Sequence, residues 1–264
     1  VGYSPNVLSK MYFEKAEVAY KDNKLMEARE NYLSAYREDS TMTIALTYLG
    51  QIYEHQKDFA EAEKYFKQSI RRNYADYMAH WFLANVYEHN GALQKALDEI
   101  TIAHILNRNN PRIITAMKEI FQKNGYRYND SWQFDPQCRV TKTDTGINLE
   151  YSGLWLGYGL AQALWYYEPG YKESMGAKDK DMSFNQDREK EGLVAVLMAA
   201  KDDKKKLIPQ SITALQAATE KKMFQEYLVY EIWLHRKPLI ASQFPEPLIA
   251  DIKNYILAVR CRKA

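Results

Sequence analysis

Two adjacent segments of equal length decide the fold: TIALTYLGQIYEHQKDFAEAEKYFKQSIRRNYAD, residues 43–76, and YMAHWFLANVYEHNGALQKALDEITIAHILNRNN, residues 77–110. They align without a gap at a spacing of 34 residues, and residues 9–42 supply a third copy in the same register. Two antiparallel helices packed about 8–10 Å apart need small side chains where they come closest. The eighth, twentieth and twenty-seventh positions of all three copies are small: Ala16, Gly50, Ala84; Ala28, Ala62, Ala96; Ala35, Ser69, Ala103.

Large side chains and turn residues keep the same spacing. The seventeenth position is Leu25, Phe59 or Leu93, and the twenty-fourth is Tyr32, Phe66 or Ile100. The turn-forming pairs between the two halves of each copy are Asp22-Asn23, Lys57-Asp58 and Asn90-Gly91. Such residues end one helix and allow the next to begin. Each copy therefore predicts a helix-turn-helix unit.

This pattern resembles the tetratricopeptide repeat (TPR) family. Two departures are Lys15, where the family usually has Leu, and the absence of the family's frequent Pro near the repeat end. A fourth copy opens at Pro111, a favourable first helical residue, and keeps the register as far as Gly125. The resemblance implies an all-α fold, a TPR-like α-solenoid wound as a right-handed superhelix. Its repeats cover about residues 9–42, 43–76 and 77–110, with a half repeat at 111–125.

The rest of the chain lacks the 34-residue register. Residues 126–148 predict a loop or a short hairpin that links the solenoid (residues 1–125) to a C-terminal helical domain (residues 149–264). We expect helices over about 151–167, 183–201, from Pro209, 223–235 and 247–262. The first of these is apolar nearly all round and so is expected to be buried. Either degenerate repeats or a bundle that caps the solenoid fits this half.

The TPR resemblance implies a concave groove, lined by the first helix of each repeat, in which a partner segment lies. The groove residues expected from the register are Phe13, Glu17, Tyr20, Tyr48, Gln51, His55, Phe82, Asn85, His89 and Glu119. Packing between repeats is the alternative role for the aromatic residues. One TPR subtype grips a C-terminal carboxylate with Lys, Asn and Arg, but this chain has Phe13, Glu17, Tyr48, Met78 and Phe82 at those places. The groove therefore predicts a partner with apolar anchors and some basic character, and no carboxylate clamp.

Composition and the absence of known motifs argue against several other classes of protein and kinds of site. The chain has 46% hydrophobic and 27% charged residues with a net charge of +2, which argues against disorder and against nucleic-acid binding through overall charge. The longest uncharged run, residues 151–167, is short for a membrane span. We find no phosphate loop or catalytic motif and expect no cofactor. His55 and His89 recur in register about 10 Å apart, too far to share a metal ion, so we expect no metal site.

Three functions fit the sequence. The first is a non-catalytic scaffold that binds a protein or peptide in the groove. The alternative is a small-molecule-binding or enzymatic C-terminal domain, with the repeats as a recruiting arm, because the 151–167 segment is rich in aromatic residues. The third is self-association. Cys138 and Cys261 could pair in an oxidising compartment or remain thiols. The chain starts at Val1, and we expect an exported bacterial protein whose signal peptide has been removed, with a cytoplasmic protein as the alternative.

Overall fold

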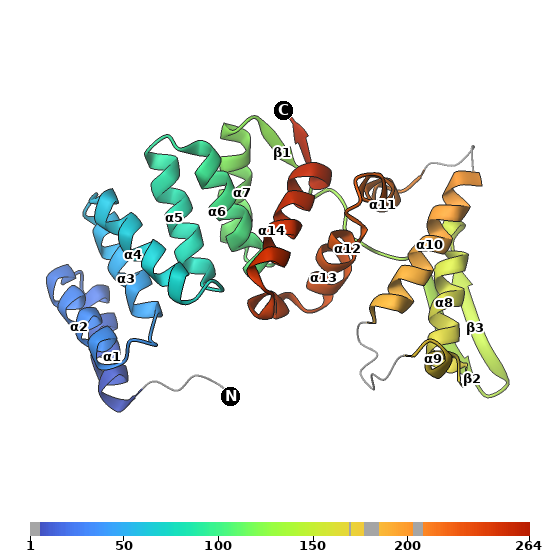
Figure 1. Cartoon of the computed structure of the whole chain (residues 1–264), viewed down its shortest axis with the longest axis horizontal. Helices are drawn as coiled ribbons and strands as arrows, with labels where there is room; N and C mark the ends of the chain where they lie inside the picture. Colours follow the sequence, from blue (N-terminus) through green and yellow to red (C-terminus); the bar gives the residue numbers. More distant parts are fainter. Residues whose placement is uncertain (1–5, 169, 177–184, 203–207) are drawn as a thin grey trace. The chain divides into compact units, whose positions relative to one another are not determined.

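The computed structural model describes residues 6–168, 170–176, 185–202 and 208–264 (Figure 1). The chain forms two compact units that do not follow the sequence in single blocks. The repeat unit contains Val1–Tyr128, Pro238–Lys253 and Arg262–Ala264. The second unit contains Asn129–Lys237 and Asn254–Cys261. The division into residues 1–125, 126–148 and 149–264 remains a prediction about domains, and each compact unit is described below by itself.

Seven helices follow one another in the repeat unit, each antiparallel to the next (Figure 1). They are α1 (Val7–Lys21), α2 (Leu25–Glu38), α3 (Ile44–His55), α4 (Phe59–Arg72), α5 (Tyr77–His89), α6 (Leu93–Leu106) and α7 (Pro111–Lys123). The turn residues Asn23, Lys57 and Gly91 have φ angles of 59°, 63° and 72°. Gly125, one period further on, has φ 75°. The repeats are thus all-α helix pairs joined by one recurring left-handed turn, and the half repeat ends in the same conformation.

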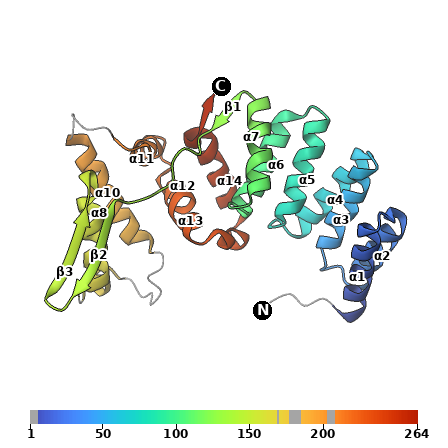
Figure 2. The same ribbon diagram turned by 180° about the vertical axis from the view of Figure 1, so that it is seen from behind.

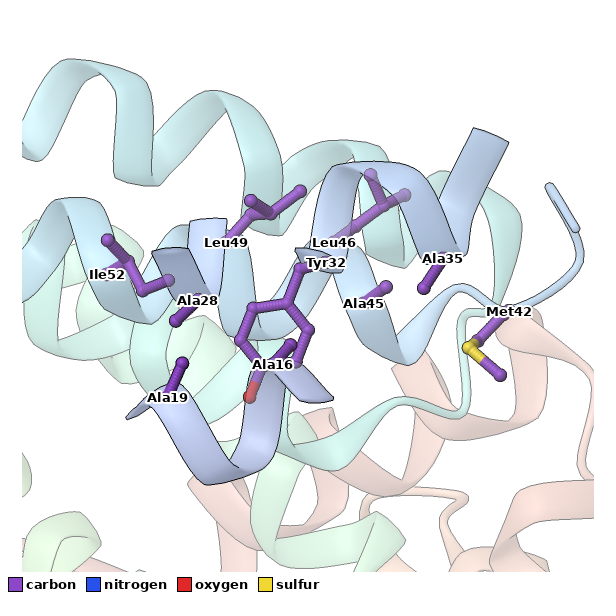
Figure 3. Close-up of a cluster of buried hydrophobic side chains, with 10 residues drawn as sticks. All are labelled: Ala16, Ala19, Ala28, Tyr32, Ala35, Met42, Ala45, Leu46, Leu49 and Ile52. Carbon is purple, nitrogen blue, oxygen red and sulfur yellow. The ribbon is translucent and has the colours of Figure 1, made fainter. Parts of the chain in front are cut away.

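The small positions allow the paired helices to touch. In the first repeat Ala16, Ala28 and Ala35 are fully buried and belong with Tyr32 to one cluster of buried side chains, in which Ala16 lies at the ring of Tyr32 (Figure 3). In the second repeat, a Cβ atom added to Gly50 would lie only 2.5 Å from the ring of Phe66. Since Phe66 fills the space that any other residue at position 50 would need, glycine is required there for close packing.

A buried polar network joins neighbouring repeats. Asp76 caps α5 by accepting hydrogen bonds from the backbone N–H groups of Met78 and Ala79, both at 3.1 Å. Its other carboxylate oxygen accepts from Thr47 Oγ1 at 2.5 Å and from Ser69 Oγ at 2.9 Å. Asp76 therefore satisfies the start of one repeat and two hydroxyl groups of the preceding one.

The end of the array is covered by a distant part of the chain. After Gly125 the chain leaves as strand β1 (Tyr126–Tyr128), which pairs with β4 (Cys261–Lys263). The short 3-10 helix η3 (Pro238–Gln243) packs against α6, and Lys253 of α14 (Glu246–Tyr255) forms an ion pair of 2.8 Å with Asp98 of α6. Nine residues of α6 are buried, against three in each of α2 and α4. Part of the C-terminal half thus packs against the last full repeat.

The second unit combines a hairpin with helices (Figure 2). Strands β2 (Cys138–Thr143) and β3 (Gly146–Tyr151) are antiparallel, with Val140 opposite Leu149. After the 3-10 turn η1 (Gly153–Trp155) comes α8 (Leu156–Tyr167), which packs against the hairpin and against α10 (Gln186–Asp202). A short helix, α9 (Tyr171–Ser174), lies between them in sequence.

Two expectations about this region were wrong. Leu149 and Tyr151 lie in strand β3 rather than in a helix, because the hairpin continues past the point where apolar residues begin. Helix α8 is also not buried all round: the stripe Leu156, Leu160 and Leu164 is 38%, 49% and 38% exposed. The expected helix start at Ser183 lies outside the described residues.

Two of the remaining helical segments of the second unit are joined by a buried ion pair. These remaining segments are α11 (Gln210–Glu220), α12 (Phe224–Tyr227), the π-helical turn η2 (Leu228–Trp233), α13 (Leu234–Arg236) and the π-helical turn η4 (Ile256–Arg260). Arg260 binds Glu231 through two hydrogen bonds of 2.7 and 2.8 Å, and its guanidinium lies 3.6 Å from the ring centre of Trp132. The last helix, expected to reach Arg262, ends at Arg260, where β4 begins.

Among the helices of the described residues, none is both long and apolar enough to cross a membrane. Cys138 and Cys261 are free thiols in the structure. Burial raises the pKa of Cys261 to about 12.

Candidate functional site

An aromatic cluster joins the first helices of repeats one and two. The ring of Phe13 on α1 makes edge contacts with Tyr32 and Tyr48, at 5.4 and 5.6 Å between ring centres. Tyr48 on α3 is stacked on the fully buried Tyr32 at 5.1 Å, and Tyr20 meets the edge of Tyr48 at 6.4 Å. Phe13, Tyr20 and Tyr48 all stay half-buried, so these rings pack between repeats and still present part of their surface.

A carboxylate stands beside these rings. Glu17 of α1 accepts a hydrogen bond from the hydroxyl of Tyr32. Burial and this hydrogen bond raise the pKa of Tyr32, and burial followed by the charge of Glu17 raises the pKa of Tyr48. Both phenols thus remain protonated donors at neutral pH. The negative charge of Glu17 lies at the edge of the aromatic cluster.

Glu54 of α3 is the most perturbed acid of this face. Burial raises its pKa to about 7, although a hydrogen bond with Asn85 of α5 acts in the opposite direction. After burial, the charge of Glu54 is the next cause that raises the pKa of Tyr20 on α1. Glu54 therefore connects the first helices of three successive repeats electrostatically.

Gln51, one helical turn before Glu54, carries an unsatisfied polar group on this face. Its Nε2 atom is buried and has no hydrogen-bond partner within the described part of the chain. A buried donor without an acceptor is destabilising, and a bound acceptor would satisfy it.

The remaining expected residues lie along the same set of helices. Phe82 of α5 stacks on Phe66 and Trp81, at 5.9 and 5.3 Å. His55, His89 and Glu119 are all exposed. The ring of His89 stacks on that of Phe59, with 4.0 Å between ring centres. Across the residues that the structure describes, no group of three His, Cys, Asp or Glu side chains could hold a metal ion.

The structure brings some of the expected residues together and leaves others apart. Phe13, Glu17, Tyr20 and Tyr48 form one cluster, and Asn85 joins Glu54. Sequence reasoning missed the burial of Glu54 and the central role of Tyr32, a second-helix residue. The repeated Tyr-Glu pair at Tyr53-Glu54 and Tyr87-Glu88 was the available signal for Glu54, but it gives no information on burial.

Comparison with known proteins agrees with this architecture. A sequence model of the tetratricopeptide repeat matches residues 13–69 and 58–105. The helix pairs of the N-terminal part of the chain are therefore tetratricopeptide repeats. No curated protein matches the chain.

Several solved structures are similar at low identity. The tetratricopeptide-repeat domain of Arabidopsis OM64 has 17% identity and a TM-score of 0.42, covering 44% of this chain and 96% of that domain. The second such domain of human RPAP3, solved with an HSP70 peptide, has 19% identity and a TM-score of 0.41, over 44% of this chain and 98% of that one. YrrB, described as a TPR protein with an unusual peptide-binding site, has 15% identity and a TM-score of 0.40, over 75% and 95%.

Repeat arrays of this kind commonly present an extended surface to other proteins.

Proposed function

We propose that the chain binds an extended or helical protein segment along the face formed by α1, α3, α5 and α7. The observation that carries this proposal is the combination of half-buried aromatic rings with the partly desolvated carboxylate of Glu54. The rings of Phe13, Tyr20 and Tyr48 offer apolar surface, and Gln51 offers an unsatisfied donor. The role is non-catalytic, since binding requires only surface complementarity.

The partner is a segment with an apolar or aromatic anchor followed by a Lys or Arg side chain. The anchor would lie against the cluster of Phe13, Tyr20 and Tyr48. The cation would lie near Glu54 and Glu17, where two carboxylates face the same set of first helices. A cation also favours the charged form of Glu54, so binding and ionisation of Glu54 reinforce each other.

The test compares the partners captured by the wild-type chain with those captured by one charge-reversal variant and one variant that removes aromatic rings. Pull-down followed by mass spectrometry is performed with the wild type, Glu54→Lys and the double variant Tyr48→Ala/Phe82→Ala. We expect both variants to lose a shared set of partners, and the lost proteins to share a segment with an apolar anchor and a basic residue.

Arg71→Glu is the matched control. Arg71 is exposed on α4, the second helix of the repeat that contains Glu54. This reversal should leave the partner list unchanged, and circular dichroism should show that every variant is folded. Identical lists for wild type, Glu54→Lys and the double variant would reject the first-helix face as the binding site.

A further inference from the structure

A cavity of about 340 Å³ lies within the second unit, remote in sequence from the repeats. Its wall comes from the hairpin region, from α8 and from α13. The lining residues are Pro136, Cys138, Val140, Tyr158, Gln162, Tyr166, Tyr167 and Arg236. Gly159 of α8 permits the hairpin to approach, because a Cβ there would lie 2.5 Å from Leu149 and 3.4 Å from Cβ of Cys138. The volume is at the small end of the range of about 300–1,000 Å³ that holds small ligands.

Gln162 places an unsatisfied donor in this wall. The residue is only 9% exposed, and within the described residues its Nε2 atom has no hydrogen-bond partner. Leaving a buried amide unpaired is unfavourable. The terminal torsion of a glutamine is soft, so the amide can turn toward an acceptor that enters the cavity.

A buried group of charged side chains lies beside Arg236, which lines the cavity. Glu189 is fully buried and accepts hydrogen bonds from Arg188 at 2.9 Å, from Arg236 at 2.8 Å and from the hydroxyl of Tyr158. Two guanidinium groups thus surround one carboxylate. The side chain of Arg236 remains 35% exposed at the cavity wall, where its further N–H groups can meet a ligand.

The other walls are aromatic and neutral. Tyr166 and Tyr167 lie 6.0 Å apart between ring centres, and the guanidinium of Arg188 lies 4.6 Å from the ring centre of Tyr166. Burial and the charge of Glu189 raise the pKa of Cys138, so this thiol is protonated at neutral pH. It therefore provides a neutral wall, and its thiol reacts with alkylating reagents only slowly.

We propose that this cavity binds a small planar organic carboxylate. The carboxylate accepts hydrogen bonds from the amide of Gln162 and from the guanidinium of Arg236, as charge-assisted hydrogen bonds favour. The planar body lies against Tyr166 and Tyr167. This site is independent of the proposed groove, because all its residues belong to the second unit.

Cys138 supplies the readout, since it lines the cavity and Cys261 does not. Benzoate is the probe, with benzamide as the uncharged analogue and benzylamine as the cationic one. The alkylation rates of Cys138 and Cys261 by iodoacetamide are followed by mass spectrometry on the full chain. A ligand of this size binds at about 0.1–10 mM, and we expect benzoate in that range to slow alkylation of Cys138 but not of Cys261. Benzamide should protect at least about fivefold less well, and benzylamine should not protect.

Two variants separate the site from general folding effects. Gln162→Leu, similar in shape but without the amide, should raise the benzoate concentration needed for half protection about tenfold. Gln225→Leu, an exposed position on α12, should behave as the wild type. Equal protection by benzoate and benzamide, or none by benzoate in the wild type, would overturn the proposal whether or not Gln162→Leu folds. Unchanged benzoate protection in a folded Gln162→Leu variant would exclude Gln162 from the site.

Discussion

Gly50 occupies a repeat position at which the packing of the two helices leaves no room for a Cβ atom. An added Cβ would lie 2.5 Å from the ring of Phe66, and this ring is fully buried. We predict that Gly50→Ala lowers the free energy of unfolding by about 1–2 kcal/mol, because overpacking outweighs the better helix propensity of alanine. Urea denaturation measures the change. Combining it with Phe66→Leu should cost less than the sum of the two single changes, and strict additivity would contradict a clash between these two positions.

Glu54 predicts a pH dependence with a definite sign. Its pKa is about 7 in the folded chain against an ordinary value of 4.5, so the folded state holds the proton more tightly between these values. Stability contributed by the protonated form is therefore lost as pH rises from about 4.5 to about 7. Glutamine does not ionise, so Glu54→Gln keeps its stability as the pH rises. The free energy of unfolding of this variant should therefore increase by about 1–2 kcal/mol relative to that of the wild type across this window, after allowance for solvent screening.

Urea denaturation of both proteins at several pH values measures this difference. A difference that stays constant from about pH 4 to pH 8 would show that Glu54 is not desolvated in the folded chain.

Small side chains could be predicted from the sequence, but buried charges could not. The nine small repeat positions follow from spacing alone, and those of the first repeat are fully buried. Glu189 lies in the polar stretch Gln186 to Lys190, which indicates a solvated helix end, and yet its side chain is fully buried. Its partners Tyr158 and Arg236 are 31 and 47 residues away. A contact over such a separation leaves no local pattern, so the cavity beside it could not be placed from the sequence.

The ion pair of Glu231 and Arg260 joins η2 to η4 in the second unit. Both side chains are buried, and Arg260 also donates to the backbone carbonyls of Asn129 and Trp132. We predict that Arg260→Met lowers the free energy of unfolding by about 3–5 kcal/mol, because it leaves Glu231 charged and buried. The double variant Glu231→Gln/Arg260→Met should be less destabilised than the sum of the two single variants. Chemical denaturation of the full chain measures this cycle, and additive effects would mean that the two groups do not interact.

The helix pairs could be predicted where the turn residues and the packing positions recur at the same spacing. In the repeats, turn residues, small positions and large positions all recur at one spacing, and the structure has a helix start at Leu25, Phe59 and Leu93. The second unit contains a turn of the same conformation as those between the paired helices of the repeats. Lys222 has φ 60°, and the N–H of Met223 bonds the carbonyl of Ala218 just as the N–H of Lys24 bonds that of Ala19. The small positions do not recur with it, so the register could not reveal this helix-turn-helix.

The two compact units share the last stretch of helix, which contributes to each core at different residues. Ile249 is 1% exposed and belongs to the repeat unit, whereas Ile256 is fully buried and belongs to the second unit. The apolar spacing of this segment is continuous across the boundary between the two units, so the sequence carries no signal for that boundary. Periodicity shows which face of a helix is buried, but it cannot show which core buries it.

This division makes a prediction that hydrogen exchange can test. Replacing a buried isoleucine with alanine removes about 2–5 kcal/mol of stability, and the loss should be felt in the unit that buries the side chain. Ile249→Ala should therefore speed exchange in α6, where Lys253 pairs with Asp98, and leave η2 protected. Ile256→Ala should speed exchange in η2, where Glu231 meets Tyr255 at 2.7 Å, and leave α6 protected. Because both substitutions lie in one continuous stretch, simple fraying of that stretch would affect both sites in both variants, and such a result would contradict two separate cores.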